Sequence, residues 1–303
     1  MLNHHCKVMT NSWIEPPNRM TLDATLPLLL RQLRLPCIGS HWQELEQQAR
    51  VGGWDPAAYL YVLAEQELDK RHQARLARLL RDAQLPVNRT LSAFDWNAVT
   101  AARGTIESMA EDSRWLQRGE NLLLFGPSGV GKTHLACGIC HRLIEQGQQV
   151  RFFAATALVQ QLQQAKRELS LSRALSRLDR HALLVIDDMG YVRRSEAETS
   201  VLFELISHRY ERRSLLVTSN QAFSDWEQVF DNTAMSVAAV DRLVDNSTVV
   251  VIEGQSYRRR RSRHAVQPGS PRLDDHQPQS TDEPITAEAE RSGDQPQKPH
   301  AHG

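Results

Sequence analysis

The chain has 303 residues, a length that fits one large domain or two of moderate size. Its 36 basic and 36 acidic residues cancel, and no apolar run approaches the roughly 20 residues that a membrane-spanning helix needs, which argues against an integral membrane protein. Residues 1–20 are polar and contain no signal-peptide core, and the 4 cysteines are expected to be free thiols. We therefore expect a cytoplasmic protein with no membrane partner.

The charge is unevenly distributed along the chain. Residues 264–303 contain seven acidic and three basic residues, are rich in Pro, Gln and Ser, and have almost no apolar side chains. This composition predicts a disordered tail. Because the whole chain is neutral, the net charge of −4 on the tail leaves +4 on residues 1–263. That mildly basic part could bind an acidic partner without requiring one.

The N-terminal region reads as helical after a short irregular start. Residues 1–19 have no clear periodicity and are expected to form a flexible extension. From Thr21 on, leucines recur every three or four positions, which predicts a helix. Pro27 interrupts the pattern, so this helix either kinks there or starts there. Pro36 is expected to end it.

Two further helices complete a predicted helical N-terminal domain over residues 20–93. Residues 39–40, Gly-Ser, are expected to form a turn, and residues 41–50 a second helix. Asp55-Pro56 has the pattern of a helix start, a capping residue followed by proline at the first helical position, and Pro86 ends the third helix.

Several basic side chains cluster on helical segments. One interpretation is a solvated face whose charges pair with nearby acids. The other is contact with nucleic acid or a protein partner, because a clustered basic helix face is a common DNA-binding feature. The residues proposed to contact DNA phosphates are Arg75, Arg78, Lys166, Arg167 and Arg173.

The most informative stretch is the sequence G-x-x-x-x-G-K-T at residues 126–133. A short apolar run at 121–125 predicts a buried strand before it, and residues 134–146 predict a helix after it. Such a loop binds nucleoside triphosphates: backbone N–H groups surround the phosphates, the lysine reaches the terminal phosphates, and the threonine hydroxyl ligates Mg²⁺. An ordinary glycine-rich strand-to-helix turn is the alternative. The residues expected to bind ATP are Gly126, Pro127, Ser128, Gly129, Val130, Gly131, Lys132, Thr133 and His134.

The remainder of residues 94–263 alternates strands and helices, which predicts an α/β fold with a parallel sheet flanked by helices. Further strands are expected at 149–153, 182–188, 214–220 and 248–252, and helices at 156–179 and 196–213.

Four polar residues near strand ends or on a late helix are candidates for catalysis and metal binding. Asp187, at the end of a buried strand, is expected to hold Mg²⁺ together with Thr133. Asp188 can orient or deprotonate the attacking water; the alternative is an exposed loop aspartate. Asn220 can contact the γ-phosphate or that water, or simply begin a turn. Arg242 is either a surface charge or an arginine finger for a neighbouring subunit.

The chain resembles IstB, the helper ATPase of a class of bacterial insertion sequences, within the AAA+ superfamily and close to the DnaC-type helicase loaders. The resemblance covers about residues 20–260. It rests on Phe94-Asp95, the loop at 126–135, Asp187-Asp188-Met189-Gly190-Tyr191, the segment 203–214, Thr218-Ser219-Asn220, Asp241-Arg242-Leu243 and residues 254–258.

The resemblance implies an AAA+ ATPase that uses ATP and Mg²⁺. It implies homo-oligomers assembled on double-stranded DNA, with ATP sites between subunits, and recruitment of a partner transposase. It also implies that Asn220 acts as a sensor and Arg242 as a finger, which adds them to Lys132 and Asp188 as the residues expected to act in catalysis.

One departure from the wider AAA+ pattern is the short sequence after Arg242. About twenty residues remain before the basic run ends, too few for a full C-terminal helical lid. A sensor arginine from the same subunit is therefore in doubt, and a neighbour would have to complete the site. The alternatives are a helicase loader, which would bind a replicative helicase instead of a transposase, and a small-molecule kinase, which would need a substrate-binding lid.

Overall fold

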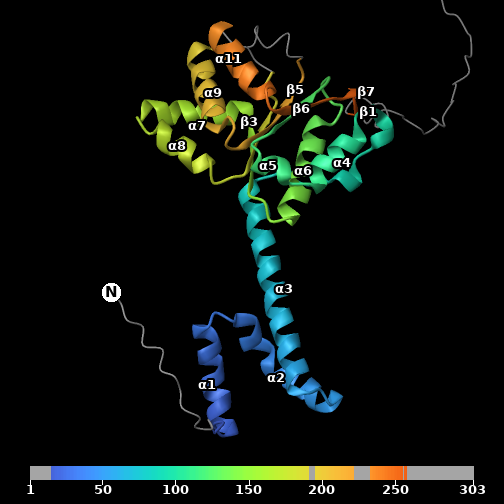
Figure 1. Cartoon of the computed structure of the whole chain (residues 1–303), viewed down its shortest axis with the longest axis vertical. Coiled ribbons are helices and arrows are strands. Elements are labelled where there is room, and N and C mark those ends of the chain that lie inside the picture. Colours follow the sequence, from blue (N-terminus) through green and yellow to red (C-terminus); the bar gives the residue numbers. More distant parts are fainter. Residues whose placement is uncertain (1–14, 191–194, 222–232, 255, 258–303) are drawn as a thin grey trace, which may run out of the picture.

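A computed structural model describes residues 15–190, 195–221, 233–254 and 256–257 (Figure 1). The predicted tail at 264–303 and most of the predicted extension lie outside these ranges. Among the described residues, no helix is both long enough and apolar enough to cross a lipid bilayer.

The N-terminal unit consists of α1 (Arg19–Gln32), α2 (Pro36–Gly52) and the long helix α3 (Pro56–Ala83). α1 starts at Arg19 and continues through Pro27, so the second of the two alternatives, a helix that starts at Pro27, is wrong. As predicted, Asp55 caps α3, accepting a hydrogen bond from the Ala58 N–H at 2.7 Å, and Pro56 follows as its first residue.

The predicted turn at residues 39–40 was also wrong, because α2 begins at Pro36 and includes both residues. The reason is a contact that a local reading of the sequence misses. The buried Glu67 carboxylate on α3 accepts the N–H groups of Cys37 and Ile38 at 2.9 and 3.1 Å, and so satisfies the exposed donors at the start of α2. Gly39 then lies against α1, where an added Cβ would be 3.8 Å from that of Leu30.

The second unit is built on a five-stranded parallel sheet in the order β3-β4-β5-β2-β6. A short antiparallel pair, β1 with β7, lies beside it. The strands are β1 (Val99–Thr100), β2 (Asn121–Phe125), β3 (Val150–Ala154), β4 (Leu183–Asp187), β5 (Ser214–Ser219), β6 (Ser247–Val251) and β7 (Glu253–Gly254).

Helices cover both faces of this sheet, and alternate residues of its strands face opposite sides. On β2, Leu123 and Phe125 belong to one buried cluster, with α7, α8, α9 and α11, whereas Leu122 and Leu124 belong to the other, with α4 and α6. The remaining helices are α4 (Arg103–Glu111), α5 (Arg114–Gln117), α6 (Lys132–Glu145), α7 (Ala155–Arg167), α8 (Leu171–Leu178), α9 (Glu196–Arg209) and α11 (Thr233–Val244), with 3₁₀ turns η1 (Leu91–Ala93) and η2 (Trp96–Ala98).

Two predicted helices are shorter in the structure. The stretch expected over 156–179 is divided into α7 and α8 at Leu169, which has φ of 53°. The helix expected over 196–213 ends at Arg209. The Arg209 side chain is fully buried and donates hydrogen bonds to the carbonyls of His181 and Ser214, each at 3.0 Å, which ties the end of α9 to the starts of β4 and β5.

α3 belongs to both units. Its first half packs on α1 and α2 around Leu30, Trp42, Leu45 and Leu63. Its last turns place Leu79 and Ala83 in the same buried cluster as α6 of the second unit. With 28 residues, α3 is about 42 Å long. In Figure 1, α1 and α2 lie beside the part of α3 that is farthest from the sheet.

Candidate ATP-binding site

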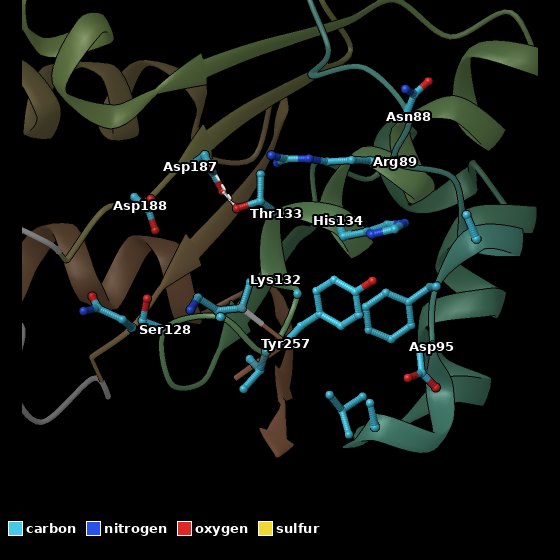
Figure 2. Close-up of a pocket in the computed structure, with 18 of the residues that line it drawn as sticks. Asn88, Arg89, Asp95, Ser128, Lys132, Thr133, His134, Asp187, Asp188 and Tyr257 are labelled. Atoms are coloured by element: carbon cyan, nitrogen blue, oxygen red, sulfur yellow. Dashed lines mark hydrogen bonds between the residues drawn. The ribbon is translucent and has the colours of Figure 1, made fainter. Parts of the chain in front are cut away.

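The carboxyl ends of the parallel strands β2, β4 and β5 meet at one pocket of about 840 Å³ (Figure 2). The loop 126–131 connects β2 to α6, Asp187 ends β4, and Asn220 follows β5. Ligand sites of parallel α/β sheets form at this edge. The pocket brings together Lys132, Thr133, Asp187, Asp188 and Asn220, all of which the sequence pattern singled out.

The glycine-rich loop needs its glycines. Gly126, Gly129 and Gly131 have φ of 149°, 89° and 98°, a region that other residues avoid. A Cβ at Gly126 would lie 2.1 Å from the carbonyl oxygen of Ile252. The backbone can therefore curl tightly and turn its N–H groups toward a phosphate, the arrangement that nucleotide-binding loops use.

Lys132 is the first residue of α6 and is only 6% exposed. Its ammonium group donates hydrogen bonds to the carbonyls of Gly126 and Pro127 at 2.8 and 3.0 Å. The cation is thus held over the loop, at the positive end of a helix, where anions bind favourably.

Thr133 and Asp187 form the pair expected to hold a metal. The Thr133 hydroxyl lies 2.8 and 3.0 Å from the two carboxylate oxygens of Asp187, and Thr218 donates to the same carboxylate at 2.6 Å. Burial raises the pKa of Asp187, and hydrogen bonds from Thr218 and Thr133 oppose that rise. A hydroxyl and a carboxylate beside a phosphate loop are hard oxygen ligands of the type that Mg²⁺ prefers.

Asp188 and Asn220 lie on the other side of this pair. Asp188 is exposed, has φ of 60°, and its N–H donates to the Thr218 hydroxyl at 3.0 Å. The left-handed backbone turns its side chain away from the strand direction and into the pocket (Figure 2). Asn220 lines the pocket, and its Oδ1 atom is buried with no hydrogen-bond partner among the residues that the structure describes.

A second wall of the pocket went unrecognised in the sequence. It comes from the connection after α3 and from the segment after β7, and its residues include Val87, Asn88, Arg89, Phe94, Asp95 and Tyr257. The Phe94 ring packs edge-on against His134, with centroids 5.3 Å apart, and the Tyr257 N–H donates to the Gly129 carbonyl at 3.0 Å. Phe94, an aromatic residue shortly before β1, was the one sequence feature that could have indicated this wall, but no local pattern marks it as part of the site.

Arg89 is the least expected member of this wall. Its guanidinium extends toward Thr133 and Asp187 (Figure 2). Its charge acts against the burial that raises the pKa of Asp187. Burial likewise raises the pKa of the Cys137 thiol, to about 11, and Arg89 opposes that rise too.

Arg242 and the five proposed DNA contacts do not line this pocket, whereas residues 128–134 of the predicted ATP-binding loop do. Arg242 stacks over the Phe203 ring at 5.1 Å and donates to the Ala238 carbonyl at 2.9 Å. The five proposed DNA contacts are all exposed, on α3, α7 and α8. Among them, Lys166 forms an ion pair with Glu204 at 2.8 Å, and Arg75 lies 3.5 Å from the Gly147 carbonyl.

The strand order, the glycine-rich loop and the carboxylate at the end of β4 define an ATP-binding P-loop protein of the AAA+ type. The model of the family "IstB-like ATP binding protein" matches residues 28–265, and the chain belongs to this family. Among the described residues, β6 and β7 follow α11, and no helical lid unit follows them there.

Relatives of known name are proteins of insertion sequences. The chain is 47% identical over 244 residues to an insertion-sequence ATP-binding protein of Sinorhizobium fredii, covering 80% of this chain and 82% of that protein. It is 33% identical to the insertion sequence IS21 ATP-binding protein of Pseudomonas aeruginosa, covering 79% and 91%. The crystal structure of the DnaC helicase loader aligns with a TM-score of 0.47 and 21% identity, over 55% of this chain and 97% of that one.

Lys132→Ala is expected to weaken ATP binding by roughly tenfold or more, because the phosphates lose a charge-assisted hydrogen bond. Titration with a fluorescent ATP analogue measures this. Lys166→Ala removes an equal charge outside the pocket and is the matched control, with unchanged affinity. Equal affinities for wild type and Lys132→Ala would contradict the assignment of the loop.

Proposed function

We propose that the chain is an ATPase that assembles on double-stranded DNA and recruits a transposase encoded nearby. The observation that carries the ATPase part is the convergence of Lys132, Thr133, Asp187, Asp188 and Asn220 on one pocket. The names of the relatives, which are insertion-sequence proteins, support the link to transposition.

Hydrolysis needs an attacking water, and we assign the orientation of that water to Asp188. Its carboxylate is exposed in the pocket, beside the Thr133–Asp187 pair, so it can accept a proton from a water at the γ-phosphate. Lys132 and Asn220 would hold the terminal phosphate, the first by charge and the second by its side-chain amide. Mg²⁺, held by Thr133 and Asp187, would neutralise part of the charge that develops on the phosphates.

Arg242 is proposed to act in a neighbouring subunit. Its side chain lies outside the pocket of its own chain, so a nucleotide phosphate that it contacts would belong to another copy. The guanidinium would have to leave the Phe203 ring to reach a phosphate, which suits a residue that engages only when subunits assemble. ATP sites between subunits would then make oligomerisation depend on ATP.

DNA binding is assigned to exposed basic residues outside the pocket. Arg167 and Arg173, on α7 and α8, form no ion pair among the described residues, in contrast to Lys166. Unneutralised arginines bind phosphates by displacing condensed counterions. We place this activity in the cytoplasm, where bacterial relatives have both ATP and chromosomal DNA.

Asp187→Asn is expected to bind ATP within a few-fold of wild type but to release phosphate at least ~100-fold more slowly, because the charge that holds the metal is lost. Phosphate release in the presence of DNA and Mg²⁺ measures the effect. Asp82→Asn, an exposed carboxylate on α3 outside the pocket, is the control. Wild-type turnover by the Asp187 variant would show that this carboxylate is dispensable.

Arg242→Ala is expected to bind ATP almost normally and to lose roughly 10³-fold or more in hydrolysis, as for other arginines supplied in trans. Mixing Arg242→Ala with Lys132→Ala protein should restore part of the activity, because some interfaces then combine an intact Arg242 with an intact Lys132. A mixture that co-assembles on DNA but stays as inactive as either variant would exclude a shared site.

Replacing Arg167 and Arg173 together with alanine is expected to reduce the slope of log K against log salt concentration by about two units, one for each lost phosphate contact. Fluorescence anisotropy with a DNA duplex at several salt concentrations, with ATP present, gives the slope. Arg142→Ala, an exposed arginine on α6 that pairs with Glu145, should leave it unchanged. Wild-type binding that does not respond to salt would rule out these contacts.

A further inference from the structure

Arg89 is one of two lysine or arginine side chains that line the ATP-binding pocket among the described residues, and Lys132 is the other. Three carboxylates, those of Asp95, Asp187 and Asp188, line the same pocket. A triphosphate is strongly anionic, and Mg²⁺ offsets only part of its charge. Every cation in this pocket therefore matters for nucleotide affinity, and Arg89 supplies one from outside the glycine-rich loop.

The segment that carries Arg89 touches the nucleotide loop at several points. Asn88, with φ of 59°, turns the chain just before Arg89. The Thr90 carbonyl lies 2.8 Å from His134 Nε2, and a Cβ at Gly138 of α6 would lie 2.7 Å from the Leu91 side chain. A Cβ at Gly131 would likewise lie 2.6 Å from the Phe94 ring. The segment 84–95, which we term the linker, thus rests on the loop and on the first turns of α6.

The linker also begins where α3 ends. α3 is fixed at that end because Leu79 and Ala83 are buried with α6 residues, and because Arg151 of β3 donates to the Asp82 carbonyl at 2.7 Å. Because the linker continues directly from α3, a displacement of the linker would pull on the last turn of this helix. Because α3 is a continuous helix, its far end would carry the change to α1 and α2.

We propose that Arg89 binds the phosphates of the nucleotide from within its own chain and thereby couples the ATP site to the N-terminal helical unit through the linker. This inference rests on the proposed function of the pocket as an ATPase site. Arg89 fills the role of a sensor arginine of the same subunit, which the sequence after Arg242 left in doubt. Its position on the linker, rather than on a lid, makes the N-terminal unit the part that senses the nucleotide.

Such coupling is reciprocal. If ATP changes how the linker packs, then whatever binds the N-terminal unit changes ATP affinity by the same factor. A partner bound to α1 and α2 would therefore tune nucleotide binding from a distance, with the linker as the connecting element.

The test uses the full chain in three variants. Arg89→Ala removes the cation, Arg89→Lys keeps the charge without the planar donor group, and Arg142→Ala removes an equal charge from an exposed position on α6. We measure affinity for Mg²⁺-ATP, and then hydrogen exchange of residues 84–93 and of α3 with and without saturating ATP. Circular dichroism and thermal melting establish that each variant is folded.

Arg89→Ala is expected to bind ATP roughly tenfold or more weakly, with partial recovery in Arg89→Lys and none of this loss in Arg142→Ala. At saturating ATP, wild type should gain exchange protection in residues 84–93, and Arg89→Ala should not. Unchanged ATP affinity in folded Arg89→Ala overturns the proposal. A variant that binds ATP more weakly but shows the wild-type exchange protection at saturating ATP overturns it as well. If wild type itself fails to bind or hydrolyse ATP, the proposed function fails; if wild type does both and Arg89→Ala behaves identically, the Arg89 inference alone fails.

Discussion

The arrangement of the site depends on one buried carboxylate. Asp187 ends β4, and its oxygens accept hydrogen bonds from Thr133 on α6 and from Thr218 on β5. Burying a charged carboxylate is unfavourable unless donors compensate it, and burial raises the pKa of Asp187 accordingly. The two hydroxyls supply the compensation. In doing so they fix the ends of two strands and the start of the helix that follows the glycine-rich loop, which sets the relative positions of Lys132, Asp188 and Asn220.

Sequence patterns predicted the parts of this site that one continuous stretch encodes. The glycine-rich loop is one run of residues, and Asp187 and Asn220 could be placed because a parallel sheet brings the carboxyl ends of its strands to one edge. The α/β fold with its five parallel strands was likewise predictable, since buried strands and amphipathic helices alternate along the chain. In each case a local pattern and a general rule of sheet topology were sufficient.

What the patterns missed depends on contacts between segments far apart in sequence. The predicted turn at residues 39–40 is helical because Glu67, on another helix, satisfies the start of α2. The break between α7 and α8 depends on a single left-handed residue, Leu169, that a helical pattern conceals. Arg89 belongs to the site because its segment folds back over α6, which no periodicity in residues 84–95 encodes. For residues 39–40 and for Arg89, a contact between distant segments outweighed the local pattern.

The side chains that line the pocket carry more negative than positive charge among the described residues. Three carboxylates face two cationic side chains there, so the pocket on its own is poorly suited to an anionic triphosphate. Lys132 and Arg89 are these two cations, and a metal held by Thr133 and Asp187 would reduce the deficit. In the transition state the phosphates need still more positive charge, and the described residues of this pocket offer no other lysine or arginine. In our proposal, Arg242 of a neighbouring subunit supplies that charge, and Arg89 links the same site to the N-terminal unit.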